Sequence, residues 1–256
     1  MAFLEGIDSL EFLLYVLLGF LAQIVDGALG MAYGVTSNSL LLSFGVSPTA
    51  ASASVHIAQV FTTLVSGLSH IRLGNLNKRL IKRLAIPGAI GGLLGAYLLS
   101  NLQGDGIKTL IAMYLLVMGI RILVKAIRYR QRSDETAHQP SLKRLELLGL
   151  FGGFFDAVGG GGWGPIVTST LISRGHSPRE TIGSVNISEF FVTLVQAAAF
   201  IVLIGVSDWT VIFGFIIGGV AAAPLGAMLT KHIKPQVMMY VVAILIIGLQ
   251  VRFLVQ

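Results

Sequence analysis

Two short segments of the chain combine an aspartate with a cluster of glycines. The first runs from Asp26 to Gly34, and the second runs from Asp156 to Gly164 and holds five glycines in nine residues. Glycine destabilises a helix by about 1 kcal/mol per residue relative to alanine. We therefore expect each segment to break a helix, so that the chain turns back and a new helix starts. Backbone N–H groups at such a start can bind an anion without any Lys or Arg.

The glycines of these segments, and the polar or aromatic residues among and after them, are candidates for substrate binding. Close helix packing is the alternative role, because small residues let membrane helices approach each other. The candidates are Gly30, Tyr33, Gly34, Thr36, Ser37, Asn38, Gly160, Gly161, Gly162, Trp163, Gly164, Thr168 and Ser169.

A polar stripe follows each glycine segment. Its residues recur every three or four positions, so they share one face of a helix. The stripe consists of His56, Gln59, Thr63 and Ser66 in the first half, and of Asn186, Glu189, Thr193 and Gln196 in the second half. A single polar residue in such a helix usually bonds to a neighbouring helix. Because the stripe occurs twice, we expect His56, Gln59 and Asn186 to line a substrate route.

Ionisable groups at membrane depth are costly and are functional candidates for that reason. Glu189, Asp26 and Asp156 are the candidates for proton coupling. Each aspartate has an alternative role, which is to accept hydrogen bonds from the backbone of its own glycine turn. Glu189 has the alternative of pairing with His56 across an axis between the two halves.

The composition is that of an integral membrane protein. Hydrophobic residues make up 54% of the 256 residues and charged residues 12%, with a mean hydropathy of +0.83. A soluble domain needs roughly a quarter charged residues. The chain has no cysteine, which excludes disulfides and thiolate chemistry. The net charge of +6 comes from basic residues between apolar segments, so it indicates membrane topology and not a nucleic-acid partner.

Apolar segments long enough to cross a bilayer recur along the whole chain. They cover residues 10–44, 49–69, 80–100 and 107–127 in the first half, and residues 145–173, 178–205, 209–230 and 235–254 in the second half. The predicted organisation is a first transmembrane repeat at 1–127, a cytoplasmic linker at 128–144 and a second repeat at 145–256.

The two halves align when the sequence is shifted by 130 residues. The shift superimposes the glycine segments, the polar stripes and a Gly-x-Ser-Pro turn at 45–48 and 175–178. The basic loop 72–83 corresponds to 205–209, which has no Lys or Arg. The copies are therefore expected to be inverted relative to each other, which requires an odd number of crossings per copy. The first segment of each copy meets this requirement if it forms a glycine-broken helical hairpin of two short arms, followed by about three transmembrane helices.

Basic residues predict which ends face the cytoplasm. All but two of the 18 Lys and Arg, Lys108 and Arg252, lie in or next to four connections that a single orientation places on the cytoplasmic side. In that orientation both termini are extracytoplasmic.

These features resemble the sulfite exporter TauE/SafE family of bacterial membrane permeases. The resemblance rests on the segment 26–34, on the run 155–165 and on the two Gly-x-Ser-Pro turns, and it covers nearly the whole chain. It implies a multi-pass protein of the bacterial inner membrane that exports sulfite, organosulfonate-type anions or other small sulfur compounds.

The predicted function is a secondary transporter that exports a small sulfur-containing anion by alternating access at the repeat interface, with a proton as the candidate coupling ion. Its expected partners are this anion, the proton and the lipid bilayer; no cofactor, metal site or nucleic acid is expected. A passive anion channel is the alternative within transport. A membrane-embedded enzyme is a distant alternative, because no metal-ligand spacing or nucleophile–base pair stands out. The sequence leaves the oligomeric state open.

Overall fold

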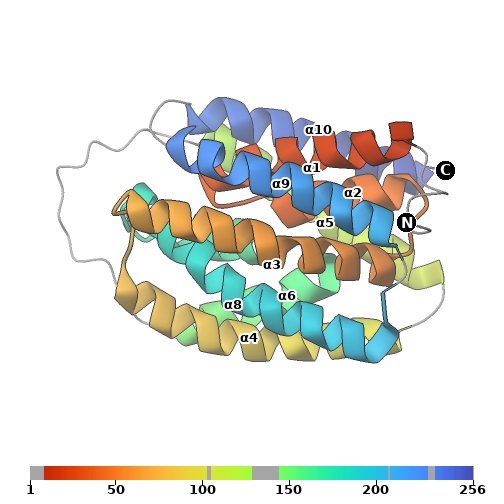
Figure 1. The fold of residues 1–256 in the computed structure, drawn as a ribbon, viewed down its shortest axis with the longest axis horizontal. Helices are drawn as coiled ribbons and strands as arrows, with labels where there is room; N and C mark the ends of the chain where they lie inside the picture. Colours follow the sequence, from red (N-terminus) through yellow and green to blue (C-terminus); the bar gives the residue numbers. More distant parts are fainter. Residues whose placement is uncertain (1–8, 103–104, 129–143, 207, 230–233, 256) are drawn as a thin grey trace.

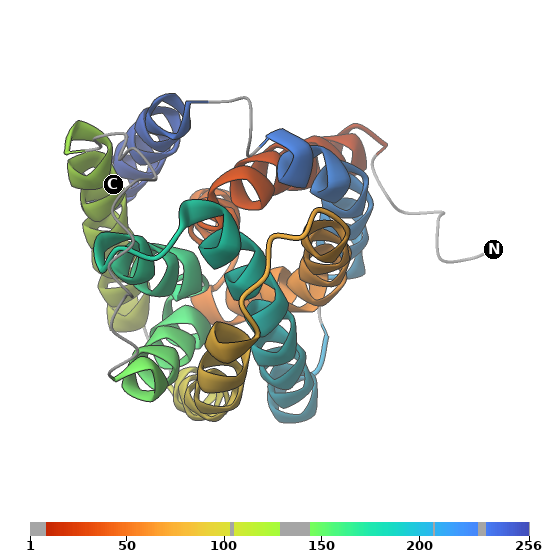
Figure 2. The ribbon, with the colours of Figure 1, turned by 90° about the vertical axis from the view of Figure 1, so that its left-hand side faces the viewer.

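Helices form all the regular structure in the part of the chain that the computed structural model describes. The described residues are 9–102, 105–128, 144–206, 208–229 and 234–255. The helices lie lengthwise side by side (Figure 1), and an end-on view shows them grouped around the chain's two broken segments (Figure 2).

Each half contains one broken helix followed by three long helices. The first half contains α1 (Ser9–Leu29), α2 (Tyr33–Ser43), α3 (Pro48–Arg72), α4 (Lys78–Asn101) and α5 (Asp105–Ile127). The second half contains α6 (Leu145–Gly159), η1 (Gly164–Thr168), α7 (Ser169–Ser173), α8 (Pro178–Ile204), α9 (Trp209–Leu229) and α10 (Pro235–Val255). Seven of these helices are long and apolar enough to cross a membrane: α1, α3, α4, α5, α8, α9 and α10. The predicted all-helical membrane fold is confirmed.

The helix breaks lie inside the two glycine segments. Gly30 and Gly160 have φ angles of +63° and +65°, in the left-handed region that glycine adopts without strain. After the second break the chain re-enters a helix through one wide turn, in which the N–H of Ser169 bonds to the carbonyl of Gly164 five residues earlier. Glycine therefore determines where both helices stop.

The first hairpin differs from the prediction of two short arms. Its first arm, α1, has 21 residues and extends about 31 Å at 1.5 Å per residue. The corresponding arm of the second hairpin, α6, has 15 residues. Helix α1 continues through Gly19 and Gly27 as far as Leu29, so it is long enough to cross a membrane by itself.

The turns after the two hairpins are alike. Gly45 and Gly175 have φ angles of +86° and +91°, and in both copies a Ser-Pro pair starts the next helix. Proline suits the first helical position because its missing N–H is not needed there. The Ser47 side chain accepts a hydrogen bond from the N–H of Ala50 at 3.3 Å.

Glycines allow two helix pairs to pack backbone against backbone. In the α1–α9 pair, a Cβ on Gly27 would lie 3.0 Å from the Cα of Gly226. In the α4–α6 pair, a Cβ on Gly91 would overlap the carbonyl of Leu150. Because α1 corresponds to α6 and α9 to α4, the two pairs are equivalent under the 130-residue shift.

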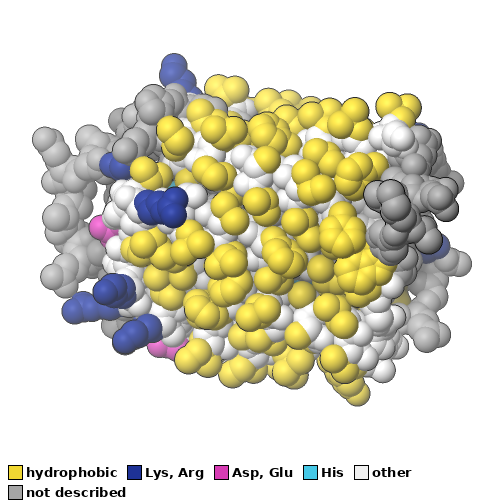
Figure 3. All heavy atoms as spheres, in the orientation of Figure 1, with side chains coloured by type: hydrophobic (Ala, Val, Ile, Leu, Met, Phe, Trp, Pro, Cys, Tyr) yellow, Lys and Arg dark blue, Asp and Glu magenta, His cyan; other side chains and the backbone are white. Residues whose placement is uncertain are grey.

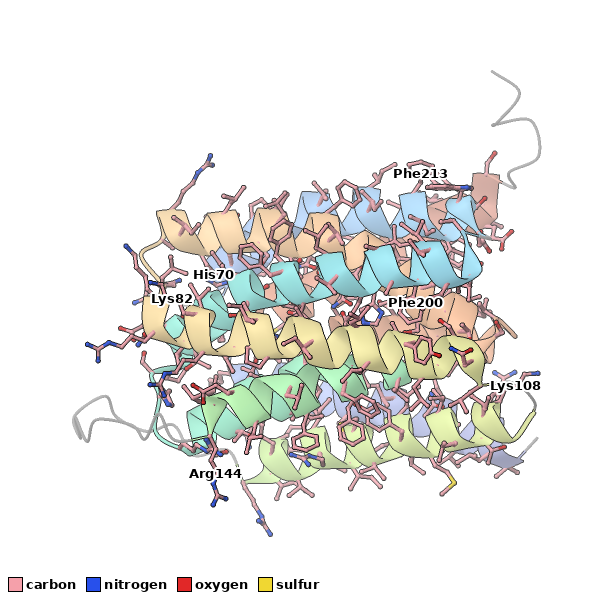
Figure 4. The ribbon with its side chains drawn as sticks, turned by 90° about the horizontal axis from the view of Figure 1, so that it is seen from below. His70, Lys82, Lys108, Arg144, Phe200 and Phe213 are labelled. Atoms are coloured by element: carbon pink, nitrogen blue, oxygen red, sulfur yellow. The ribbon has the colours of Figure 1, made fainter. Side chains whose placement is uncertain are left out.

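The other helix contacts show the same equivalence between the two halves. Helix α3 packs on α9 as α8 packs on α4, while α3 packs on α8 and α5 on α10. Figure 1 shows α1 beginning, and α10 ending, at one end of the bundle. Figure 4 places Arg144, which precedes α6, at the other end with Lys82 and opposite Lys108. Two copies related by a two-fold axis would give this pattern, and the inverted-repeat organisation stays a prediction.

Apolar side chains cover the outside of the bundle between its two ends. Figure 3 shows this hydrophobic band, with Lys and Arg side chains gathered mainly toward one end. The large apolar residues Leu10, Ile86 and Val202, for example, are 75%, 69% and 83% exposed, respectively. Such a surface fits contact with lipid and not with water.

The orientation can be tested with two equivalent serines. Ser47 and Ser177 are exposed and occupy the same position in the two Gly-x-Ser-Pro turns. In this cysteine-free chain, we expect Ser177→Cys to react with a membrane-impermeant thiol reagent only from the cytoplasmic side, and Ser47→Cys only from the outside. Labelling of intact cells and of inverted vesicles measures this. Reaction of both variants from the same side would contradict the inverted repeat.

Candidate functional site

The two broken segments lie side by side and antiparallel at the centre of the bundle. A Cβ on Gly34 would lie 2.7 Å from both the carbonyl oxygen of Gly160 and the Cα of Gly161. A Cβ on Gly164 would overlap the backbone of Met31. We call residues 30–38 and 159–168 the seam.

Two hydrogen bonds close the ends of the seam. The Thr168 hydroxyl donates to the carbonyl of Gly30 at 2.6 Å, and the Asn38 amide donates to the carbonyl of Gly159 at 2.7 Å. Thr168 and Asn38 occupy equivalent positions in the two copies. Each copy therefore satisfies a carbonyl that the helix break in the other copy leaves free.

Each hairpin extends past the centre to the start of a long helix in the other copy. The Ser52 hydroxyl, in the second turn of α3, donates to the carbonyl of Ala157 at 2.7 Å. At the equivalent position in α8, Ile182 packs on Gly30, where a Cβ would lie 3.2 Å from the Ile182 side chain. The hairpins overlap along the seam and do not meet tip to tip.

Asp156 holds the second hairpin in place. Its Oδ1 accepts hydrogen bonds from the N–H groups of Gly162 at 2.7 Å and Trp163 at 3.0 Å. Its Oδ2 accepts from the Gln196 amide at 3.1 Å and lies 3.2 Å from Nε2 of His56. The side chain is 1% exposed. Asp156 therefore does bond to its own glycine turn, and two of the backbone N–H groups expected to bind an anion are occupied by its carboxylate.

The His56 ring bridges Asp156 and helix α3. Nδ1 of His56 lies 2.6 Å from the carbonyl of Ser52, which can only accept, so Nδ1 carries a hydrogen. Nε2 of the same ring lies 3.2 Å from Oδ2 of Asp156, so His56 links Asp156 to the backbone at the start of α3.

The pairing of Glu189 with His56 is wrong. Glu189 Oε1 instead accepts a hydrogen bond from the Gln59 amide at 3.2 Å. Gln59 and Glu189 are equivalent residues of the two polar stripes, so they meet where α3 and α8 pack together. Asp156 reaches His56 first because the second hairpin passes beside the first turns of α3.

The three proton-coupling candidates lie near one another. Asp26, Asp156 and Glu189 are at most 3% exposed, and each of them interacts electrostatically with the other two. Asp26 also accepts a hydrogen bond from the N–H of Tyr33. Three ionised carboxylates beside the single ring of His56 would be costly to bury. Burying the three acidic side chains together therefore requires hydrogen bonds or protons to compensate their charge.

The aromatic rings of Tyr33 and Trp163 are packed between helices. The Trp163 indole N–H donates to the carbonyl of Val185 at 3.3 Å, and its ring fills a space beside Gly88 of α4, where a Cβ would lie 2.6 Å from it. The Tyr33 ring occupies the equivalent position against α9, with its centroid 6.3 Å from that of Phe215. The two rings anchor the start of each returning arm.

Several other predicted site residues hold buried polar atoms without a hydrogen-bond partner among the described residues. The Asn186 amide donates to the carbonyl of Ile182 at 3.0 Å, while its oxygen is unpartnered. Further unpartnered atoms of this kind are Oδ2 of Asp26, Oγ1 of Thr36, Oγ of Ser37, Oδ1 of Asn38, Oε1 of Gln59 and Oε2 of Glu189. Buried polar atoms normally have partners, so this group can hydrogen-bond a guest or water.

Helix α5 contributes two residues that the sequence analysis did not include in the site. The Tyr114 hydroxyl donates to the carbonyl of Gly161 at 3.1 Å, and the Lys125 ammonium donates to Ser169 Oγ at 3.1 Å. Tyr114 is a lone aromatic in an apolar helix, and Lys125 lies among the basic residues that indicate topology. Their separation of 11 residues, three helical turns, is the one signal that they share a face.

Comparison with known proteins gives concordant results. The model of the family described as sulfite exporter TauE/SafE matches residues 15–253. A Bacillus subtilis (strain 168) protein named "Probable membrane transporter protein YtnM" is 44% identical over 249 residues, which cover 96% of this chain and 83% of that protein. Another protein of the same strain, "Probable membrane transporter protein YdhB", is 24% identical over 232 residues, covering 89% and 90%. No solved structure gives a significant match.

The seam predicts how glycine substitutions affect stability. A Cβ on Gly161 would overlap the backbone of Val35, whereas a Cβ on Gly162 would overlap the Tyr114 hydroxyl. We expect each of Gly161→Ala and Gly162→Ala to destabilise the protein by about 1–3 kcal/mol, the usual cost of overpacking. In a Tyr114→Phe background the cost should fall for Gly162→Ala and persist for Gly161→Ala.

Thermal unfolding of the purified protein in detergent measures these costs. Gly106→Ala is the control, because no atom lies within 4 Å of a Cβ there. Equal costs for Gly161→Ala and Gly106→Ala would show that the two backbones do not touch at the seam.

Proposed function

The chain belongs to the sulfite exporter TauE/SafE family and is a membrane transporter, and we propose that it exports a small sulfur-containing anion, such as sulfite or an organosulfonate, by alternating access. The seam carries this proposal. Broken helices that cross at the centre of a membrane bundle are the usual substrate sites of secondary transporters. Irregular backbone survives at that depth only where protein or a wet cavity satisfies its polar groups.

The second hairpin already binds an anionic oxygen. Oδ1 of Asp156 lies on the N–H groups of Gly162 and Trp163, as an oxygen of a sulfite or sulfonate group would. A substrate that takes these N–H groups must displace the carboxylate. The unpartnered Ser37 hydroxyl can donate a further hydrogen bond to such an oxygen, whereas the unpartnered Oδ1 atoms of Asn38 and Asn186 can accept one from a hydrogen on the substrate or on water. The two N–H groups and the Ser37 hydroxyl favour a small oxyanion.

Alternating access fits the way the helices group. Helix α9 packs on α1 and α3, helix α4 packs on α6 and α8, and the two groups meet where α3 packs on α8. Rocking one group against the other would open the seam from one end and then from the other. A passive channel needs a lasting open path, and the backbone contacts of Gly34 with Gly160 and Gly161 do not favour one.

Proton coupling is proposed for the carboxylate cluster. Glu189 is the first candidate, because among the described residues only Gln59 hydrogen-bonds to its carboxyl group and its Oε2 is unpartnered. Asp26 and Asp156 follow, each beside its glycine segment. We propose the bacterial inner membrane as the location, with the basic end of the bundle in the cytoplasm and both termini outside.

A screen of small anions tests the proposed substrate class. We expect sulfite, thiosulfate, sulfoacetate or taurine to raise the unfolding temperature of the purified protein in a saturable way, because a ligand that binds the folded state stabilises it. Chloride at the same ionic strength is the control. If no sulfur-containing anion stabilises the protein more than chloride does, the proposed substrate class is wrong.

Replacing Glu189 tests the coupling. Glu189→Gln keeps the shape of the side chain but removes its titration, so anion binding should survive while transport loses its dependence on a pH gradient. Uptake into proteoliposomes, with and without an imposed gradient, measures this. Glu180→Gln, at an exposed position of the same helix, is the matched control. Unchanged gradient dependence in Glu189→Gln would remove Glu189 from the mechanism.

A further inference from the structure

Lys125 differs from every other lysine and arginine that the structure describes. The others are exposed, whereas Lys125 is partly buried in the last turn of α5. Arg121, one turn earlier on the same helix, is exposed. Lysine usually keeps its charged group in water even when its alkyl stem is buried. The inward orientation of the Lys125 ammonium group therefore needs an explanation.

The Lys125 ammonium reaches the seam. It donates to Ser169 Oγ on the returning arm of the second hairpin at 3.1 Å, and it lies 3.8 Å from the sulfur of Met31 in the first glycine segment. A Cβ on Gly164 would overlap Met31, so Met31 itself lies between the two hairpins. One cationic group thus contacts both hairpins where they overlap.

No carboxylate among the described residues lies within 4.0 Å of this ammonium. The ammonium has three hydrogens to donate, and a hydroxyl and a thioether are neutral acceptors. A cation that is partly withdrawn from water is stabilised most by an anion. The surroundings of Lys125 therefore lack the negative charge that would complement it.

We propose that Lys125 and Ser169 form a subsite for a small oxyanion on the basic-end side of the seam, and that the charge of Lys125 makes this subsite prefer dianions. The proposal rests on the proposed anion transport. A lysine ammonium acts as a compact point charge on a flexible stem. It can follow an oxyanion from the basic end of the bundle to the hydroxyl of Ser169.

The preference for dianions follows from Coulomb's law. A dianion interacts with the Lys125 charge twice as strongly as a monoanion at the same distance. The fold-loss in affinity when the charge is removed should therefore be squared for a dianion. Loss of packing or of a neutral hydrogen bond would affect both kinds of anion equally.

The test compares thiosulfate, a dianion, with methanesulfonate, a monoanion, on the full-length protein. We expect Lys125→Gln to weaken methanesulfonate binding about tenfold and thiosulfate binding about a hundredfold at low salt. Lys125→Arg should retain the preference for the dianion. Arg121→Gln, which removes an exposed charge one turn away, should change both affinities little and equally.

Each other outcome overturns the proposal in a distinct way. Equal losses for the two anions in Lys125→Gln would show a structural role. Unchanged anion binding with loss of co-purified anionic lipid would assign Lys125 to a lipid headgroup. If the wild-type protein binds neither anion nor any other sulfur-containing anion, the proposed function fails; binding that Lys125→Gln leaves intact refutes the subsite alone.

Discussion

The structure depends on satisfying backbone hydrogen bonds at two helix breaks inside an apolar bundle. Water cannot reach most of these groups, so the protein must supply the partners. Asp156 takes the N–H groups of the second break. Carbonyls at the breaks accept from the side chains of Asn38, Thr168 and Tyr114. Apart from Asp156, each of these partners comes from another hairpin or helix, and this mutual dependence fixes how the two halves pack.

The two hairpins are equivalent in position but not in bonding. Asp156 binds His56 and Gln196, and under the 130-residue shift the positions equivalent to these two are occupied by Asn186 and Ser66. Neither of these supplies a cation, and Oδ2 of Asp26 has no partner among the described residues. The aspartate of the second hairpin therefore has more hydrogen-bonding partners than the aspartate of the first. Hydrogen bonds to a carboxylate are stronger than neutral ones, so in the proposed alternating access we expect the first hairpin to move more easily than the second.

The sequence was sufficient for features that depend on local chemistry. The glycine segments located both breaks, Ser-Pro pairs located the starts of α3 and α8, and the polar stripe located His56, Gln59 and Glu189 on buried faces. It was not sufficient for features that depend on how far one hairpin overlaps the other. Because of that overlap, His56 contacts Asp156, and Glu189 hydrogen-bonds to Gln59 instead. The inward turn of Lys125 likewise depends on where Ser169 lies, which neighbouring residues in the sequence do not reveal.

The charges along the seam suggest why a proton and an anion would move together in the proposed transporter. The Lys125 ammonium lies beside Met31 and Ser169, on the basic-end side of the seam. The carboxylates of Asp26, Asp156 and Glu189 lie around the centre of the seam. An anion drawn toward Lys125 meets these carboxylates next, and like charges repel strongly where water is excluded. In the proposed mechanism, protonation of the cluster would remove that repulsion and weaken the hydrogen bonds that Asp156 accepts from the N–H groups of Gly162 and Trp163. The anion could then take the place of the carboxylate oxygen, so that anion entry at the centre would be coupled to a proton.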